Sequence, residues 1–420
     1  MSLPRVKSRQ SANPTDQVTL TTNEKILREC HSLYIDPEKG LIKIAEHFGL
    51  KLLAPRKKIV VLLIGNHSAG KSSFINWYIE EHVQRTGVAI ETQGFVIVTS
   101  GKKRESLMGN ATLHLYPHFR PLQEIQGVVD FLSTEISTSK QKKFSLVTFV
   151  DTPGLVDGDM QYPFDVNEAI LWLGKMADLI FTFFDPIGQA LCKRTLNLVE
   201  KLNNAHTDKM RFYLSKADDA GDESDRQRVM MQIVQELCKR PGLNRTGFDM
   251  PTIYIPKENA RCVNQIEMVC KDIERMINQT IQNTLNALES DCDTVLELVD
   301  KKLKDDSTNR SSNFRSSSIS LVIGVLAVLL PIAIIWNHSM KTFSWNMEQL
   351  YQDFSFLWIP LISVIVILLL KWFTKLKPTL SRKERRYFSD VQNHIETVLK
   401  PRKQQLYRLY LEQSVGDHDL

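Results

Sequence analysis

The chain has 420 residues, of which 43% are hydrophobic and 24% are charged. These values are ordinary for a folded globular protein, so the composition excludes a disordered or fibrous chain. The net charge is +5, an excess too small to indicate nucleic acid as a partner. Six cysteines stand at irregular spacings without a CxxC pair. This argues against a disulfide framework or a zinc site and favours buried thiols in a reducing compartment.

The N-terminal region is polar at first and then becomes periodic. Residues 1–22 lack the apolar core of a secretory signal, and we expect them to form a disordered tail. Between Asn23 and Leu53 apolar residues recur at helical spacing, which predicts two short helices. Asp36, which precedes Pro37, is the expected N-cap of the second helix because proline fits the first helical position.

Residues 55–262 alternate between apolar runs and helical stretches. The run Lys57–Ile64 is almost continuous in β-branched and other aliphatic residues, as expected of a strand buried on both faces. Strand and helix in alternation predict an α/β domain with a mostly parallel, doubly wound sheet. The other expected strands are Phe144–Val150, Leu179–Phe184, Met210–Leu214 and Thr252–Ile255.

A phosphate-binding pattern joins the first of these strands to a helix. The sequence GNHSAGKS fits GxxxxGK[ST], the pattern of P-loop nucleotide hydrolases. Its glycines let backbone N–H groups turn around phosphates at a helix N-terminus, while Lys71 reaches the β- and γ-phosphates and Ser72 binds Mg²⁺. The predicted nucleotide-binding residues here are Gly65, Asn66, His67, Ser68, Ala69, Gly70, Lys71, Ser72 and Ser73.

Three further pieces follow in the order that a GTPase needs. Thr92 is the candidate switch hydroxyl for Mg²⁺. In DTPG, Asp151 is expected to hold Mg²⁺ through water, and the Gly154 N–H to meet the γ-phosphate. In SKAD, Asp218 is expected to accept from guanine N1–H and N2–H, while Lys216 packs its stem over the base. Each piece is weak alone, but together after a P-loop they indicate a nucleotide site.

A long helical pattern begins near residue 263. Apolar residues at steps of three or four continue to Leu303 and predict one amphipathic helix of roughly 40 residues. Residues 382–412 carry a matching stripe, so we expect the two helices to pair, with Pro401 kinking or breaking the second. Two core helices without special function are the alternative.

Two uncharged apolar segments lie between these helices. Ser316–Met340 and Phe354–Leu370 contain no Asp, Glu, Lys or Arg. We predict a transmembrane hairpin with spans at about 319–337 and 354–373. At ~1.5 Å per residue the second uncharged run spans about 25 Å, slightly less than the ~30 Å hydrocarbon core. A pair of buried apolar helices or a re-entrant hairpin is the alternative.

Charge predicts the orientation of the hairpin. Lys and Arg gather on both flanks, whereas the connecting loop contains only Lys341 among basic residues. The positive-inside rule therefore places both termini in the cytosol. Short spans favour a thin bilayer such as the endoplasmic reticulum, with the mitochondrial outer membrane and endosomes as alternatives. The predicted layout is a tail (1–22), N-terminal helices (23–54), a G domain (55–262), a stalk helix (263–315), the hairpin (316–376) and a C-terminal stalk-pairing helix with tail (377–420).

The motifs GNHSAGKSSFINWYIEE, ETQGFVIV, FVDTPGL and SKAD together resemble the dynamin superfamily. The resemblance is strongest to the Eps15-homology-domain (EHD) ATPases and sarcalumenin, and it covers roughly residues 25–290 without the hairpin. The layout is similar to that of atlastins, mitofusins and bacterial dynamin-like proteins. The resemblance implies a dynamin-type G domain that binds nucleotide with Mg²⁺, self-associates and acts on membranes.

The sequence departs from the family pattern at two positions. Ser215 stands where the base-recognition motif [NT]KxD has Asn or Thr, and His67 stands where dynamins carry the Gln that places the attacking water. EHD proteins prefer ATP as a family, so ATP is the alternative to GTP. Ile255-Pro256-Lys257 follows the strand before the expected fifth guanine motif but matches no recognisable pattern.

We therefore expect a membrane-anchored GTPase that hydrolyses GTP with Mg²⁺ to remodel, tether or fuse intracellular membranes. The expected catalytic residues are His67, Ser68, Lys71 and Thr92. An EHD-like ATPase or a low-turnover nucleotide-binding scaffold is the alternative. A channel fits poorly because neither span contains an ionisable residue apart from Lys371 near the end of the second. The expected partners are the lipid bilayer and further copies of the chain, and not nucleic acid.

Overall fold

The computed structural model describes residues 20–87, 94–157, 162–187, 191–244, 249–257, 262–342, 364–365, 368 and 376–416. Thr92 and most of the predicted second span lie outside these residues. The chain divides into two compact units, one made of 1–36, 53–287 and 406–420 and the other of 37–52 and 288–405. The domain boundaries expected from the sequence stay predictions.

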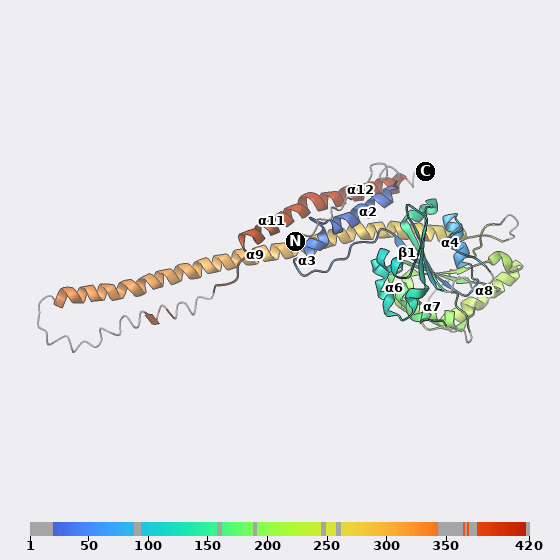
Figure 1. Cartoon of the computed structure of the whole chain (residues 1–420), viewed down its shortest axis with the longest axis horizontal. Coiled ribbons are helices and arrows are strands. Elements are labelled where there is room, and N and C mark those ends of the chain that lie inside the picture. Colours follow the sequence, from blue (N-terminus) through green and yellow to red (C-terminus); the bar gives the residue numbers. More distant parts are fainter. Residues whose placement is uncertain are drawn as a thin grey trace, which may run out of the picture. The chain divides into compact units, whose positions relative to one another are not determined.

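The described residues of the first unit form a seven-stranded sheet in the order β3-β4-β2-β5-β1-β6-β7 (Figure 1). The pairs β1–β5, β1–β6, β2–β4 and β6–β7 are parallel, while β2–β5 and β3–β4 are antiparallel. This confirms the predicted α/β fold with a mostly parallel sheet. The strands are β1 (Ile59–Gly65), β2 (Phe95–Ser100), β3 (Glu105–Met108), β4 (Leu132–Ser137), β5 (Val147–Asp151), β6 (Leu179–Phe184) and β7 (Met210–Leu214).

Two predicted strands need correction. Thr252–Ile255 is not a strand, because only Thr252 bridges to β7, through Leu214. Prolines flank this segment on both sides, and a proline cannot donate to a ladder. Residues 144–146 belong to the 3-10 helix η3 (Gln141–Leu146), so the predicted strand begins only at Val147. Strands β2, β3 and β4 were not predicted: Ser, Thr and Glu interrupt the apolar pattern of β3 and β4, and the apolar run of β2 is only four residues long.

Helices cover both faces of the sheet. On one face Phe74 of α4 (Lys71–Ile79) meets Phe149, Phe181 and Phe183 edge to face. The other face packs against α6 (Val166–Met176) and α7 (Lys193–His206), where Leu62 of β1 shares a buried core. Because β1 is buried on both faces, its side chains are aliphatic without alternation. The remaining elements of this region are α5 (Asn110–Leu115), η1 (Pro117–Glu124), η2 (Val128–Phe131), η4 (Thr207–Lys209), η5 (Ala217–Asp219) and α8 (Glu223–Cys238).

The two N-terminal helices are α2 (Thr22–Ile35) and α3 (Leu41–Glu46). A capping box between Thr21 and Glu24 begins α2, which satisfies N–H groups that the helix itself cannot. The predicted N-cap role of Asp36 is wrong: Asp36 ends α2, and Gly40 precedes α3. All six cysteines are free thiols; Cys30, Cys192 and Cys292 are buried, as expected, whereas the other three are only partly buried.

The helix α9 runs from Ile266 to Thr342. Its apolar stripe is buried from Ile266 to Val299. In the second unit Lys403 and Lys400 pair with Glu289 and Asp293 of α9 at 2.5 and 2.7 Å. These contacts set the C-terminal helices antiparallel to α9.

The C-terminal helices are α11 (Arg382–His394), η8 (Ile395–Leu399) and α12 (Lys400–Gly416). Pro401 does not break the helix, because backbone dihedrals stay helical through Lys400 and a π turn, η8, precedes the proline. A π turn widens the helix, which relieves the clash between the ring and the preceding turn. Tyr410 rather than Leu409 is buried, and its hydroxyl accepts from Gln282 Nε2 at 2.9 Å.

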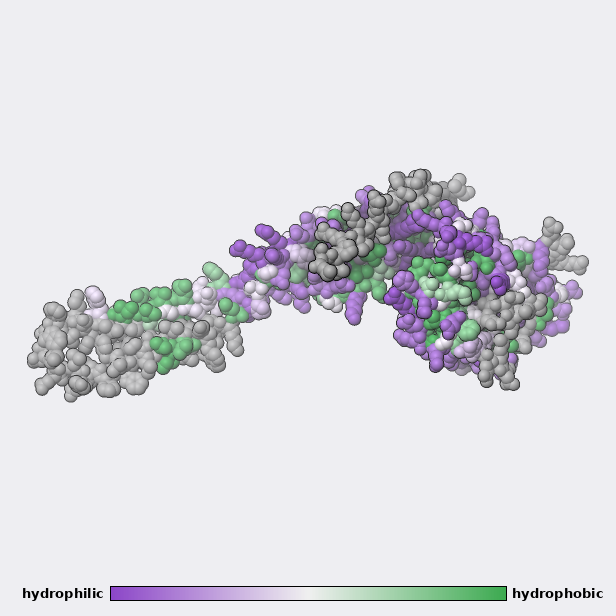
Figure 2. Space-filling view, viewed as in Figure 1, coloured by the Kyte–Doolittle hydropathy of each residue, from purple (hydrophilic) through white to green (hydrophobic). Residues whose placement is uncertain are grey.

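Toward its C-terminal end α9 is apolar and its described side chains are exposed. The helix over Ile266–Leu329 contains a window long and apolar enough to cross a membrane, and none of that window is buried. Leu321 is 67% exposed and Leu326 is 50% exposed. Figure 2 shows this stretch as a hydrophobic region of the surface. By length and composition, therefore, the first predicted span is a membrane-crossing candidate, while the second lies largely outside the described residues.

A group of polar side chains on α9, here called the clasp, holds the chain where it returns from the apolar segment. Asn313 bonds both the N–H and the C=O of Lys377, at 2.9 and 2.8 Å. Asp306 Oδ1 accepts from the Leu380 N–H at 2.6 Å, and Arg310 donates to the Leu380 carbonyl at 2.7 Å. Seven helical residues rise about 10 Å, as do three extended residues. The two chain segments therefore match in length.

Candidate functional site

The predicted P-loop lies between the end of β1 and the start of α4 (Figure 1). A side chain at Gly65 would place its Cβ 2.6 Å from the Phe183 carbonyl oxygen, so this position accepts only glycine. Ser68 and Gly70 have φ of 58° and 85°, which lets successive N–H groups turn toward one side. Ala69 is buried, and Ser73 lies within α4. The turn therefore has the form that a phosphate group requires.

Lys71 begins α4 and points back into this turn. Its ammonium donates to the carbonyls of Gly65 and Asn66 at 3.3 and 3.1 Å. Burial lowers the pKa of Lys71, and the nearby Asp151 carboxylate opposes that shift. The carbonyl oxygens that contact the Lys71 ammonium carry only partial negative charge. A phosphate would supply a full negative charge to this ammonium.

Ser72 and Asp151 meet across the turn. The Ser72 hydroxyl donates to Asp151 Oδ2 at 2.5 Å. Asp151 is fully buried, and its other oxygen, Oδ1, has no hydrogen-bond partner among the described residues. Burial raises the pKa of Asp151, while Lys71 and Ser72 lower it. A hydroxyl and a carboxylate with an unused buried oxygen are the hard oxygen ligands that fit Mg²⁺.

The segment after Asp151 is bonded to the P-loop itself. The His67 N–H donates to the Leu155 carbonyl at 3.1 Å, and the Leu155 N–H donates to Gly65 at 3.2 Å. A Cβ on Gly154 would lie 2.6 Å from the Cα of His67, so glycine is required for this approach. The predicted phosphate-sensing residues Gly154 and His67 are thus adjacent.

The predicted base loop follows β7. The Ser215 hydroxyl and N–H both donate to the Phe184 carbonyl, at 3.2 and 2.9 Å. Lys216 has φ of 50°, and its ammonium lies 3.5 Å from Asp185 Oδ2. Asp218 Oδ2 lies 2.7 Å from the ammonium of Lys257. Ser215 is therefore bound to the sheet, whereas the nearly buried Asp218 and the partly exposed Lys216 each have a charged partner.

The structure brings most of the predicted site residues together at the carboxyl ends of β1, β5, β6 and β7, where parallel sheets bind ligands. Thr92 lies outside the described residues, and its role stays a prediction. Sequence reasoning missed two contacts that shape the site. The Thr195 hydroxyl donates to Asn66 Oδ1, and Asp157 accepts from the N–H groups of Lys193 and Arg194 at 2.7 and 3.0 Å. Both contacts join distant parts of the chain, so no local signal marks them.

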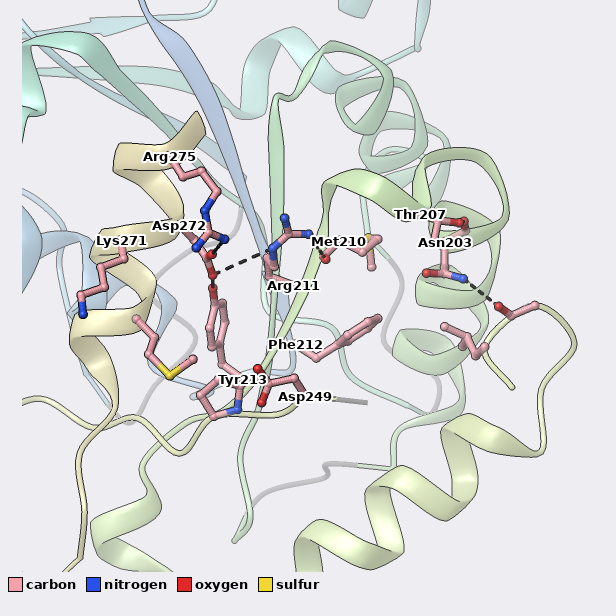
Figure 3. A pocket seen from close by; sticks show the side chains of 14 residues that line it. Asn203, Thr207, Met210, Arg211, Phe212, Tyr213, Asp249, Lys271, Asp272 and Arg275 are labelled. Carbon is pink, nitrogen blue, oxygen red and sulfur yellow. Dashed lines mark hydrogen bonds and ion pairs between the residues drawn. The ribbon is translucent and has the colours of Figure 1, made fainter. Parts of the chain in front are cut away.

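A cavity of about 510 Å³ lies beside β7 and the start of α9 (Figure 3). It contains none of the P-loop residues and is not the nucleotide site. On its wall the Tyr213 hydroxyl donates to Asp272 Oδ2 at 2.8 Å, and Arg275 lies 3.3 Å from Asp272 Oδ1. Burial and the Asp272 charge raise the pKa of Tyr213. These contacts tie β7, which carries the base loop, to the first turns of α9.

Residues 61–230 match the Dynamin family. EH domain-containing protein 1 of Arabidopsis thaliana is 28% identical over 233 residues, which cover 52% of this chain and 41% of that protein. EH domain-containing protein 3 of Homo sapiens is 29% identical over 168 residues, 38% of this chain and 31% of that protein. The chain thus matches less than half the length of these relatives.

Among solved structures, a bacterial dynamin pair described as oligomerised and membrane-tethering aligns over 84% of this chain and 59% of its own. The identity is 13% and the TM-score 0.43, a likeness too weak to support an argument about function. Residues 61–230 are thus similar to the Dynamin family, and the mostly parallel sheet has the fold of a P-loop nucleotide hydrolase.

Proposed function

We propose that this chain, which carries a dynamin-family G domain, is a membrane-anchored GTPase. It binds and hydrolyses GTP with Mg²⁺ and uses the cycle to remodel, tether or fuse membranes. The observation that carries the proposal is the hydrogen bond from Ser72 to the buried Asp151 beside the P-loop, with Asp151 Oδ1 lacking a partner among the described residues. A buried polar atom without a partner is costly unless a ligand satisfies it.

The residues of the chain take separate roles in this proposal. The N–H groups of the P-loop and the N-terminus of α4 hold the phosphates, and Lys71 leaves its carbonyl partners to neutralise them. Ser72 and Asp151 hold Mg²⁺, Asp151 through water, and the bound ion neutralises charge on the β- and γ-phosphates. The described residues contain no cluster of three or more His, Cys, Asp or Glu side chains. This fits an ion whose remaining ligands are phosphate oxygens and water.

Positioning of the attacking water falls to the backbone near Gly154 and to His67, a P-loop residue whose N–H is bonded to the Leu155 carbonyl. Ser68, in the left-handed conformation next to it, stabilises charge that develops during transfer. Thr92 completes the predicted metal set. These roles depend on where the groups lie relative to the phosphates, because phosphoryl transfer needs little covalent chemistry from the protein.

Membrane attachment is proposed from the exposed apolar part of α9. Such a helix loses its unfavourable contact with water by entering a bilayer. The Lys and Arg residues near both ends favour a cytosolic location for the G domain and both termini. We propose further that copies self-associate through their G domains and helices, and that the membrane is that of the endoplasmic reticulum.

ATP is the second candidate substrate. Its support is Ser215, whose hydroxyl is committed to the Phe184 carbonyl, so it does not take the place of the usual Asn in reading guanine.

The test is nucleotide binding and hydrolysis by the full chain in detergent and in liposomes. GTP binding with Mg²⁺ should be lost in Lys71→Ala and weakened in Asp218→Ala, and liposomes should stimulate hydrolysis. Lys239→Ala is the matched control, since Lys239 is an exposed lysine paired with Glu236 on α8. A preference for ATP would make ATP the substrate in place of GTP. Failure to bind either nucleotide would contradict the enzyme proposal.

A further inference from the structure

The carboxylate proposed to recognise guanine has a lysine beside it. Lys257 Nζ lies 2.7 Å from Asp218 Oδ2 and 3.6 Å from Asp219 Oδ1. The Asp218 side chain is 9% exposed, whereas that of Lys257 is 60% exposed. One member of the pair is therefore fixed in the loop, and the other is free to adjust its position.

Backbone contacts place Lys257 next to this loop. The Leu214 N–H donates to the Pro251 carbonyl at 3.0 Å, and the Ile253 N–H donates back to Leu214 at 2.8 Å. The Ala217 N–H, inside the base loop, donates to Ile253 at 3.2 Å. The segment that carries Lys257 thus runs along the end of β7 and the base loop, so the ion pair is a consequence of the fold.

The pair matches one face of guanine. Guanine presents the acceptor O6 beside its N1–H and N2–H₂ donors, whereas adenine has the N6–H₂ donor where guanine has O6. A carboxylate beside an ammonium offers an acceptor next to a donor. Adenine would place its own donor against the ammonium and its acceptor N1 against the carboxylate, leaving both pairs mismatched.

Other side chains of the loop are already committed. The Ser215 hydroxyl donates to the Phe184 carbonyl, and Ser215 is buried. The Lys216 ammonium faces Asp185 instead of Asp218. Lys257 is left as the described donor in contact with the carboxylate that reads the base.

We propose that Lys257 is a specificity-determining residue: its ammonium donates to guanine O6 while Asp218 accepts from N1–H and N2–H₂. This inference rests on the proposed GTP function and assigns the O6 donor that Ser215 does not provide. Without nucleotide, the ammonium balances the charge of Asp218. The hydrogen bond to Asp218 raises the pKa of Lys257, so the donor stays protonated at neutral pH.

The experiment compares triphosphates that differ at the base edge, using the full chain in detergent with Mg²⁺. ITP keeps O6 and N1–H, whereas 2-aminopurine riboside triphosphate lacks both O6 and N1–H and keeps the 2-amino group. Lys257→Met should lower the affinity for GTP and for ITP by about 10- to 100-fold, as expected for the loss of a hydrogen bond from a charged donor. Its affinity for the 2-aminopurine nucleotide should change little. Lys257→Arg should restore much of the GTP affinity, and Lys239→Met should have no effect.

The outcomes separate this inference from the proposed function. If wild type prefers GTP and Lys257→Met weakens all triphosphates equally or none of them, the inference fails and the GTPase proposal stands. If wild type binds no guanine nucleotide, or binds it independently of Lys71, both fail. A selective loss of GTP and ITP, rescued by Arg, supports the assignment of O6 to Lys257.

Discussion

Two apolar runs of similar composition have opposite surroundings in this protein. Strand β1, IVVLLIG, is buried at every position between β5 and β6. The stretch Ile319–Leu329 of α9 is also rich in Val, Ile and Leu, yet its side chains are largely exposed. Apolar side chains thus favour burial away from water, but the surrounding structure determines what covers them. For β1 the cover is the chain itself, and for α9 we propose a bilayer.

The largest effect should come from truncating β1. Leu62 is fully buried in the core between the sheet, α6 and α7. Leu62→Ala should lower the free energy of unfolding by about 2–5 kcal/mol, because it removes apolar contact and leaves a cavity. Thermal unfolding of the full chain in detergent, followed by circular dichroism, measures this. The matched Leu326→Ala on α9 should change the free energy of unfolding by less than about 0.5 kcal/mol, and an equal loss in both would break the comparison.

Membrane insertion, unlike folding stability, should be sensitive to the apolar stretch of α9. Leu326→Arg places a charge in the middle of the proposed span and should oppose insertion by about 2.5–3.5 kcal/mol. Alkaline extraction of membranes that contain the full chain measures the fraction inserted. Leu326→Ala serves as the control. Retention of both variants at the wild-type level would argue that this stretch is covered by protein.

The clasp offers a smaller test, in the second unit. Asp306 is buried and binds both the Leu380 N–H and Arg310 Nε, at 2.6 and 2.8 Å. Asp306→Ala leaves these donors without their acceptor and should cost about 1–3 kcal/mol. Thermal unfolding and limited proteolysis near residue 380 measure the change. Asp305→Ala, at the exposed neighbour, should be neutral; equal effects would show that the clasp adds no stability.

Acid should weaken the sheet-bearing unit through His118. Burial, together with the nearby Arg56 charge, lowers the pKa of His118 from 6.5 to about 4. Between these values the unfolded chain binds a proton that the folded chain does not, so the free energy of unfolding falls as pH drops through this window. We expect a loss on the order of 1–2 kcal/mol, since the side chain is partly exposed.

The measurement is the urea midpoint between pH 4 and 7. His118→Gln should flatten part of the slope, and His114→Gln, at an exposed position, should not. A slope that is identical in all three proteins would assign the pH effect to other groups.

Local pattern explains which features the sequence predicted. The P-loop was found because its glycines and Lys71 are contiguous and act through their own backbone geometry. Strands β1 and β6 were found because burial at every position makes them continuously apolar, and β7 was found although Arg211 interrupts it. Strands β2, β3 and β4 were missed, because their pairing with strands far along the chain, rather than their own pattern, defines them.

The sequence by itself determined the P-loop, the apolar stretch of α9 and the alternation that builds the sheet, since each depends on neighbouring residues. Only the tertiary structure decided that Lys257 pairs with Asp218, 39 residues away, and that Asp306 accepts a hydrogen bond from the Leu380 N–H, 74 residues away. It also bound Ser215 to the sheet and left Asp151 Oδ1 without a partner among the described residues. The physical reason is that charge pairing and hydrogen bonding act between groups that folding brings together, whatever their separation along the chain.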